Sequence, residues 1–155
     1  MSGMESNERP PFVHRRRVEF GDTDMAGITH FASYFRFLEE AEHAYLRAVG
    51  LSVFTRTGAD VLTWPRLSAR CDFHRPSRFE DVLDVEVRVK ELSRKTVTYR
   101  FDVRHGEHPV ATGETVVVCC QIDSAHELKS TPIPDDVRRR LTLGPPSEEP
   151  APSDE

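Results

Sequence analysis

The chain has 155 residues, of which 37% are hydrophobic and 30% are charged, proportions that fit one globular domain. Its formal net charge of −5 argues against a dedicated nucleic-acid binder, because phosphate contacts need an excess of clustered Lys and Arg. No run of roughly 18 apolar residues occurs, so we expect no membrane span and no membrane partner.

The two ends of the chain have the composition of tails around one domain over residues 13–143. Residues 1–12 are polar, contain proline and lack the apolar centre of a secretory signal, which favours a cytoplasmic location. Residues 144–155 combine Pro, Ser and acidic side chains without an apolar face, so we expect both tails to be disordered. The three cysteines are expected to be reduced packing residues.

The first predicted elements are a short strand over residues 16–20, a turn over residues 21–27 and one long helix over residues 31–49. Apolar residues recur along this helix at spacings of three and four, as on the buried face of an amphipathic helix. They are Tyr34, Leu38, Ala41, Tyr45 and Ala48. Gly50 is suited to a left-handed helix end, and Thr29 could cap the helix start.

After residue 66 the apolar residues alternate with polar ones, which predicts strands with one buried and one wetter face. The predicted strands cover residues 67–73, 83–89, 97–103 and 110–122. A short closing helix is predicted over residues 134–141, with acids in its first turn and arginines in its last. One long helix covers only one face of such an antiparallel sheet, so we expect oligomerisation to cover the other face or an edge.

Asp22 and Asp24 are candidates for chemistry, because they stand one residue apart in a turn directly before the long helix. A helix N-terminus offers unpaired N–H groups and partial positive charge to a developing oxyanion. A carboxylate beside it can attack a polarised carbonyl or activate water against it. Both residues can equally serve as turn residues that bond nearby amides, and their spacing does not separate these roles.

Five segments of the sequence match the pattern of a known family. They are residues 20–28 (FGDTDMAGI), 32–41 (ASYFRFLEEA), 75–83 (RPSRFEDVL), 91–97 (ELSRKTV) and 111–116 (ATGETV). Together they resemble the 4-hydroxybenzoyl-CoA thioesterase-like family of hotdog-fold acyl-CoA thioesterases, in register over about residues 14–141. The resemblance implies an α+β hotdog fold, a five-stranded antiparallel sheet wrapped around one long central helix.

The same resemblance implies that the chain hydrolyses an acyl-CoA to a carboxylate and CoA, with Asp24 as nucleophile or general base. Asp22 would then brace the turn. The oxyanion donor of the family is a backbone N–H at the helix start, which corresponds to Phe31, with His30 as the neighbouring candidate. Gly27 would let the backbone approach the thioester closely. His30 could donate to the carbonyl or the leaving thiolate, or serve only as a cap or pocket wall.

Other residues are expected to contact the substrate. Tyr34 is a candidate pocket residue, although its place on the apolar stripe also fits the core. Arg94 and Lys95 match a position where family members present basic residues, so they are candidates for the phosphates of CoA. The resemblance implies no metal or redox cofactor, and a homodimer or homotetramer that holds the acyl-CoA between subunits.

Other interpretations of the sequence stay open. Glu39, Glu40 and Glu42 resemble the helical catalytic glutamate of a different hotdog branch, although helical acids more often form a solvated face. A hotdog domain can also bind acyl-CoA without hydrolysis, or hydrate an enoyl-thioester with an Asp and His pair. The basic clusters at residues 15–17 and 138–140 are expected to be solvated.

Overall fold

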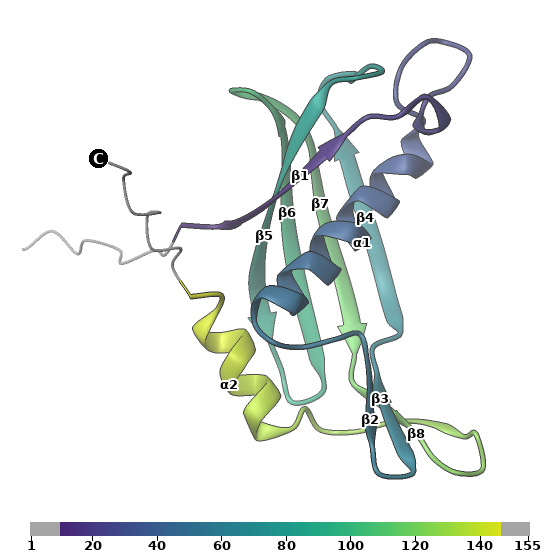
Figure 1. Cartoon of the computed structure of the whole chain (residues 1–155), viewed down its shortest axis with the longest axis vertical. Coiled ribbons are helices and arrows are strands. Elements are labelled where there is room, and N and C mark those ends of the chain that lie inside the picture. Colours follow the sequence, from purple (N-terminus) through teal and green to yellow (C-terminus); the bar gives the residue numbers. More distant parts are fainter. Residues whose placement is uncertain (1–9, 147–155) are drawn as a thin grey trace, which may run out of the picture.

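A computed structural model of the chain describes residues 10–146, and its largest element is an antiparallel sheet of five strands in the order β1-β5-β6-β7-β4 (Figure 1). The strands are β1 (Phe12–Arg17), β5 (Val82–Leu92), β6 (Thr96–His105), β7 (His108–Val118) and β4 (Arg66–Phe73). Neighbouring strands pair antiparallel throughout, and alternate residues of β5, β6 and β7 face the core, whereas β4 is exposed except at the half-buried Cys71. The alternation of the sequence therefore predicted β5 and β6 with their buried faces, and predicted β4 as a strand, but the buried face expected of β4 is open in a single chain.

The long helix α1 (Phe31–Ala48) lies across one face of this sheet, as Figure 1 shows. Phe37, Leu38 and Tyr45 are buried between helix and sheet. Leu38 packs directly over Gly113 of β7, where an added Cβ would meet the Leu38 side chain. Gly50 ends the helix with φ +77°, so the predicted left-handed end is confirmed.

Of the two residues that the sequence offered as helix caps, the structure confirms His30 and not Thr29. His30 is the N-cap of α1, and its side chain accepts a hydrogen bond from the Ala32 N–H. Thr29 is instead buried, and its N–H donates to the carbonyl of Ser77, 2.8 Å away. The Thr29 Oγ1 also lies 2.6 Å from the Ser77 Oγ, so its side chain faces the loop between β4 and β5 rather than the helix end.

The second sheet was not predicted. Its four strands, in the order β2-β3-β8-β9, are β2 (Phe54–Thr57), β3 (Asp60–Thr63), β8 (Cys120–Ile122) and β9 (Leu128–Ser130). The predicted strand over residues 110–122 breaks at Cys119. The Cys119 N–H donates to the backbone carbonyl of Lys95, and the Cys119 carbonyl accepts from the N–H of Thr131. The chain therefore changes sheets at this residue.

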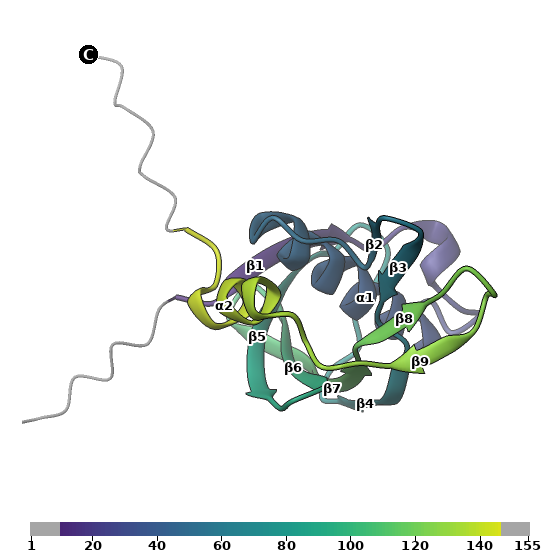
Figure 2. The same ribbon diagram turned by 90° about the horizontal axis from the view of Figure 1, so that it is seen from below.

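The smaller helix α2 (Asp135–Leu143) confirms the predicted closing helix and sits with the second sheet at the end of the main sheet where α1 ends (Figure 2). Two arginines of its basic cluster are not simply solvated. Arg138 donates to the carbonyls of Ser93 and Arg94, and Arg140 donates to the carbonyl of Val49 beside the end of α1. These bonds fasten α2 to the β5–β6 turn and to the long helix.

The first strand begins and ends earlier than predicted. β1 pairs with β5 from Phe12 to Arg17, and residues 20–22 form a 3-10 turn, labelled η1 (Phe20–Asp22), instead of continuing the strand. Phe12 thus belongs to the sheet, although it was expected in the N-terminal tail. The rest of the two expected tails, apart from residues 10–11 and 144–146, lies outside the described residues.

The face of the main sheet that looks away from α1 is polar. It carries ion pairs such as Arg70–Asp72, Arg100–Asp102 and Lys90–Glu114, so this face needs no apolar cover. Within residues 10–146, no helix combines the length and the apolar composition that a bilayer crossing requires.

Candidate active site

The turn before α1 closes on itself and presents Asp24 at its tip. The Asp24 N–H donates to the Ile28 carbonyl at 2.9 Å, and the Gly27 N–H donates to the Asp24 carbonyl at 3.0 Å. Thr23 and Thr29 form an isolated antiparallel β-bridge across the turn. Gly27 has φ +77°, a left-handed conformation that costs glycine little. The backbone bonds of the turn thus fix the position of a residue that projects outward.

The Asp24 carboxylate is exposed and sparsely engaged. Its Oδ1 accepts one hydrogen bond, from the Ala26 N–H at 2.9 Å, and no cation of residues 10–146 forms an ion pair with it. This single bond holds the carboxylate in one orientation and leaves an oxygen for substrate or water. A carboxylate in this state can act as a base or as a nucleophile.

The helix start offers one unpaired backbone donor in reach of the same turn. The His30 N–H donates to the Asp22 carbonyl at 2.8 Å, so it is already used. The Phe31 N–H stands at the first helical position, where no preceding turn supplies a carbonyl, and it has no acceptor among the described residues. Of the two candidates from the sequence, Phe31 is therefore the donor whose N–H is available.

Asp22 is the buried support of this arrangement. Its carboxylate accepts from Arg16 at 2.7 Å, from the Glu19 N–H at 2.8 Å and from Arg36 at 3.3 Å. Burial alone would raise the pKa of the Asp22 carboxyl, but the bonds from Arg16 and Glu19 and the charge of Arg36 hold that pKa below its ordinary value. Its carbonyl accepts from both His30 and Ser33, which joins the turn to the helix.

A chain of three hydroxyls lies beneath the turn. The Tyr34 hydroxyl lies 2.8 Å from the Ser77 Oγ, which lies 2.6 Å from the Thr29 Oγ1. Tyr34 is only 3% exposed, and burial raises the pKa of its phenol. Its side chain therefore supports the wall behind the turn, and within one chain its hydroxyl is already bonded.

The structure does not bring Arg94 and Lys95 near Asp24 within one chain. Arg17, which precedes the turn that carries Asp24, pairs with Val82 at the start of β5, whereas Arg94 and Lys95 follow the end of β5 at Leu92. Ten residues of strand separate these points, which is roughly 30 Å. The Lys95 ammonium lies at this far end, where it donates to Ser130 of β9 at 3.0 Å.

Each glutamate of the long helix that was considered from the sequence has an arginine partner. Arg66 contacts Glu39 at 3.3 Å and Glu42 at 2.7 Å, and Arg16 contacts Glu40 at 2.8 Å. Glu42 is 1% exposed, so the expectation of a solvated face is wrong for this residue. Burial raises the pKa of Glu42, and the charge of Arg66 opposes that shift.

Sequence reasoning missed the residues that hold the turn in place. Arg16 was placed in a solvated basic cluster, yet it points to the α1 side of the sheet and bridges Asp22 and Glu40. Strand alternation would have separated Arg16 from its outward neighbours Arg15 and Arg17, had the strand been predicted over residues 12–17. Ser77 carries no sequence signal, because its role depends on a contact with Thr29 across 48 residues.

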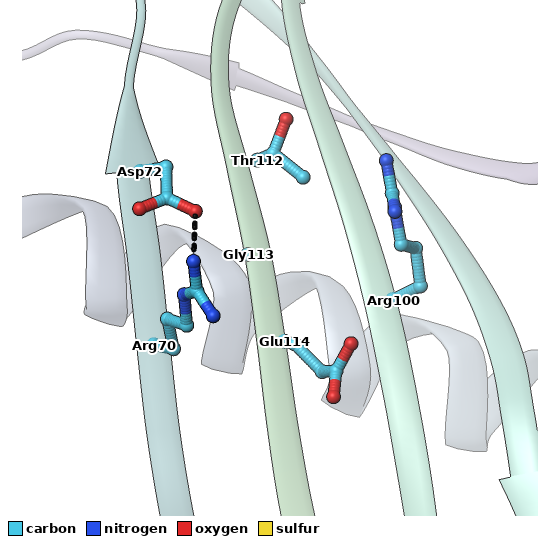
Figure 3. Close-up of a pocket in the computed structure, with 6 residues that line it drawn as sticks. All are labelled: Arg70, Asp72, Arg100, Thr112, Gly113 and Glu114. Atoms are coloured by element: carbon cyan, nitrogen blue, oxygen red, sulfur yellow. Dashed lines mark hydrogen bonds and ion pairs between the residues drawn. The ribbon is translucent and has the colours of Figure 1, made fainter.

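Two surface depressions of the described chain lie away from Asp24. One, of about 200 Å³, lies on the polar sheet face, where Figure 3 shows Arg70, Asp72, Arg100, Thr112 and Glu114 around it. The other, of about 320 Å³, lies between β1 and α1 and is lined by His14, Arg16, Glu40, His43 and Arg47. Neither depression contains Asp24, Phe31 or Gly27. No three His, Cys, Asp or Glu side chains in residues 10–146 are placed to share a metal ion.

Part of the apolar surface that a single chain leaves open borders the start of α1 and the edge strand β4. Phe31 is 63% exposed, Leu67 62% and Phe73 49%, and the Phe73 ring lies 5.3 Å from that of Tyr34. β4 pairs only with β7, so its other edge has unpaired backbone groups. This apolar surface thus lies at an edge of the main sheet and not on its back.

Comparisons with known proteins agree with this geometry. The pattern of the thioesterase-like superfamily matches residues 18–141. A putative esterase of Aquifex aeolicus is 38% identical over 107 residues, which cover 68% of this chain and 81% of that protein. The 1,4-dihydroxy-2-naphthoyl-CoA hydrolase of Synechococcus elongatus is 31% identical over 135 residues, which cover 85% of this chain and 96% of that protein. A solved gentisyl-coenzyme A thioesterase superposes with a TM-score of 0.72 at 26% identity, over 84% of this chain and 97% of that one.

Proposed function

The chain belongs to the thioesterase-like superfamily and is a thioester hydrolase, and we propose that it acts on acyl-CoA with Asp24 as its catalytic carboxylate. The observation that carries this proposal is the pairing of an exposed, sparsely bonded Asp24 with the unpaired N–H of Phe31. Both groups belong to one turn, which the bond from the His30 N–H to the Asp22 carbonyl closes.

The reaction consumes water and an acyl-CoA and gives a carboxylate and CoA. The Phe31 N–H and the positive end of α1 stabilise the negative charge that develops on the thioester oxygen. Asp24 either takes a proton from the attacking water or attacks the carbonyl carbon itself, with a mixed anhydride that water then cleaves. Gly27 adds no side chain at the tip of the turn, which leaves room for the thioester to approach.

An aromatic acyl group fits the surroundings of this turn. Phe31 and Phe73 expose apolar ring surface beside the helix start, and Tyr34 packs against Phe73. Two relatives are named for the aromatic acyl-CoAs that they hydrolyse, 1,4-dihydroxy-2-naphthoyl-CoA and gentisyl-CoA. We therefore assign this chain an aromatic acyl-CoA in preference to a straight-chain one.

A second copy of the chain completes the proposed site. Edge-to-edge pairing through β4 would satisfy its free backbone groups and cover Leu67 and Phe73. In this hotdog dimer α1 becomes a central helix with sheet around it. Arg94 and Lys95, far from Asp24 in their own chain, would then contact the phosphates of a CoA whose acyl end lies at the partner's turn.

Release of free thiol by the purified full-length protein tests the proposal. The substrate panel contains short, long and aromatic acyl-CoAs, and we expect turnover that is fastest with the aromatic members. An enoyl-CoA is included, and we expect no loss of its conjugated double bond. No thiol from any member, together with a rise in melting temperature on adding acyl-CoA, would identify a binding module and overturn the proposal. Hydration of the enoyl-CoA without thiol release would identify a hydratase instead.

A further inference from the structure

We propose that the side chain of His30 supplies a second hydrogen-bond donor to the thioester oxygen, through its Nε2–H. This inference rests on the proposed function and adds a residue to its site. Oxyanion sites commonly combine two or more donors, whereas the Phe31 N–H is a single one. His30 directly precedes Phe31 in the chain, so its ring stands at the same helix start.

The hydrogen bond at Nδ1 fixes which ring nitrogen of His30 carries the proton. Nδ1 lies 3.1 Å from the Ala32 nitrogen and accepts its N–H. An accepting nitrogen must hold a lone pair, so the neutral ring carries its proton on Nε2. The helix cap therefore selects the tautomer whose donor points away from the cap.

The Nε2–H of His30 is available to a substrate. The ring is exposed and stacks on the Phe31 ring, with centroids 4.8 Å apart and planes 25° apart. Stacking holds the plane of the imidazole, and the bond to Ala32 fixes its remaining rotation. No acidic side chain within residues 10–146 forms an ion pair with His30, so the ring has no carboxylate to bind Nε2–H.

The cap and the donor reside on different nitrogens, so two substitutions separate them. His30→Ser keeps a side-chain acceptor for the helix start and removes the donor, whereas His30→Ala removes both. We expect kcat to fall about 100-fold in both variants, with KM nearly unchanged, because one oxyanion donor is lost. We expect a lower melting temperature for His30→Ala and an unchanged one for His30→Ser.

His30→Asn is the rescue variant, because its side chain offers an acceptor for the cap and an N–H₂ donor. We expect it to regain part of the kcat that His30→Ser loses. The proposed role of Nε2–H would be overturned if His30→Ser kept the wild-type kcat, or if His30→Ser and His30→Asn lost kcat equally. Either result would leave the assignment as a hydrolase intact. A wild-type protein that releases no thiol would instead contradict the proposed function itself, so the two failures are distinguishable.

Discussion

At the scale of the residue, Asp22 and Asp24 show how two identical side chains acquire different tasks. Asp22 is 5% exposed and its carboxylate is bound by two arginines and a backbone N–H, whereas Asp24 is exposed and accepts one bond. A carboxylate with its oxygens occupied is a support, and one with a free oxygen is available for chemistry. Local bonding, more than residue type, distinguishes the two acids.

Removing the charge of Asp22 should destabilise the fold. Asp22→Asn leaves Arg16 without one of its two acidic partners, so we expect the free energy of unfolding to fall by about 3 kcal/mol at neutral pH. Urea titration of wild type and variant measures this difference. Asp84→Asn is the control, because Asp84 pairs with the exposed Arg15. This substitution should lower the free energy of unfolding by less than about 1 kcal/mol.

The effect of Asp22 should also depend on pH. Its folded pKa lies below the ordinary value, so its stabilising charge is fully present above about pH 4 and is lost as the pH falls through the folded pKa. The stability difference between wild type and Asp22→Asn should therefore shrink in acid. A difference that stays constant from neutral pH down to about pH 3 would contradict the ion pairs described for Asp22.

The motif of the turn was sufficient to propose Asp24 and to predict Asp22 as its brace, but it did not indicate Arg16 or Ser77. Asp24, Gly27, His30 and Phe31 lie within eight residues of sequence, so their proximity follows from local structure. Arg16 and Ser77 reach the turn only through the folded sheet and a loop contact. Sequence periodicity describes neighbours along one element and carries no information on these long-range partners.

At the scale of the element, the regular segments were predictable and the places where the chain changes sheets were not. α1 and the long strands repeat their apolar residues over two or more turns or pleats, which makes the pattern clear. β2 and β3 have four residues each and are joined across a glycine turn, so they offer little alternation. The break at Cys119 depends on bonds to Lys95 and Thr131.

The close approach of α1 to the sheet predicts a strict size limit at position 113. Gly113→Ala would place a methyl group against the buried Leu38, so we expect a loss of about 1–3 kcal/mol in the free energy of unfolding. Gly21→Ala adds the same methyl group where no atom lies within 4 Å and should leave the stability nearly unchanged. Equal melting temperatures for the two variants would contradict the packing of α1 on β7.

At the scale of the whole molecule, the distribution of apolar surface favours assembly through an edge. The back of the main sheet carries paired charges, whereas β4 exposes Leu67 and Phe73 beside a free backbone edge. Apolar surface at an unpaired strand is unfavourable in a monomer. The sequence predicted that some surface needed cover, and only the structure distinguished the edge from the sheet face.

A charge at this edge should prevent assembly. Leu67→Arg places a cation in the proposed contact, so we expect light scattering to show a fall from the mass of two or four chains to that of one. Activity should fall with it, because the proposed CoA site needs both copies. Val13→Arg is the control, since Val13 is 43% exposed on β1, the strand at the opposite edge of the main sheet. An unchanged mass for Leu67→Arg would place the contact elsewhere.

The central claim is that this molecule hydrolyses acyl-CoA at Asp24, and the kcat of Asp24→Asn tests it most directly. The control is Asp123→Asn, because Asp123 also accepts a backbone N–H two residues on, at 2.9 Å, in a turn far from α1. We predict that thiol release falls about 1,000-fold or more in Asp24→Asn, at an unchanged melting temperature, and stays at the wild-type rate in Asp123→Asn. Wild-type turnover by Asp24→Asn would contradict the claim.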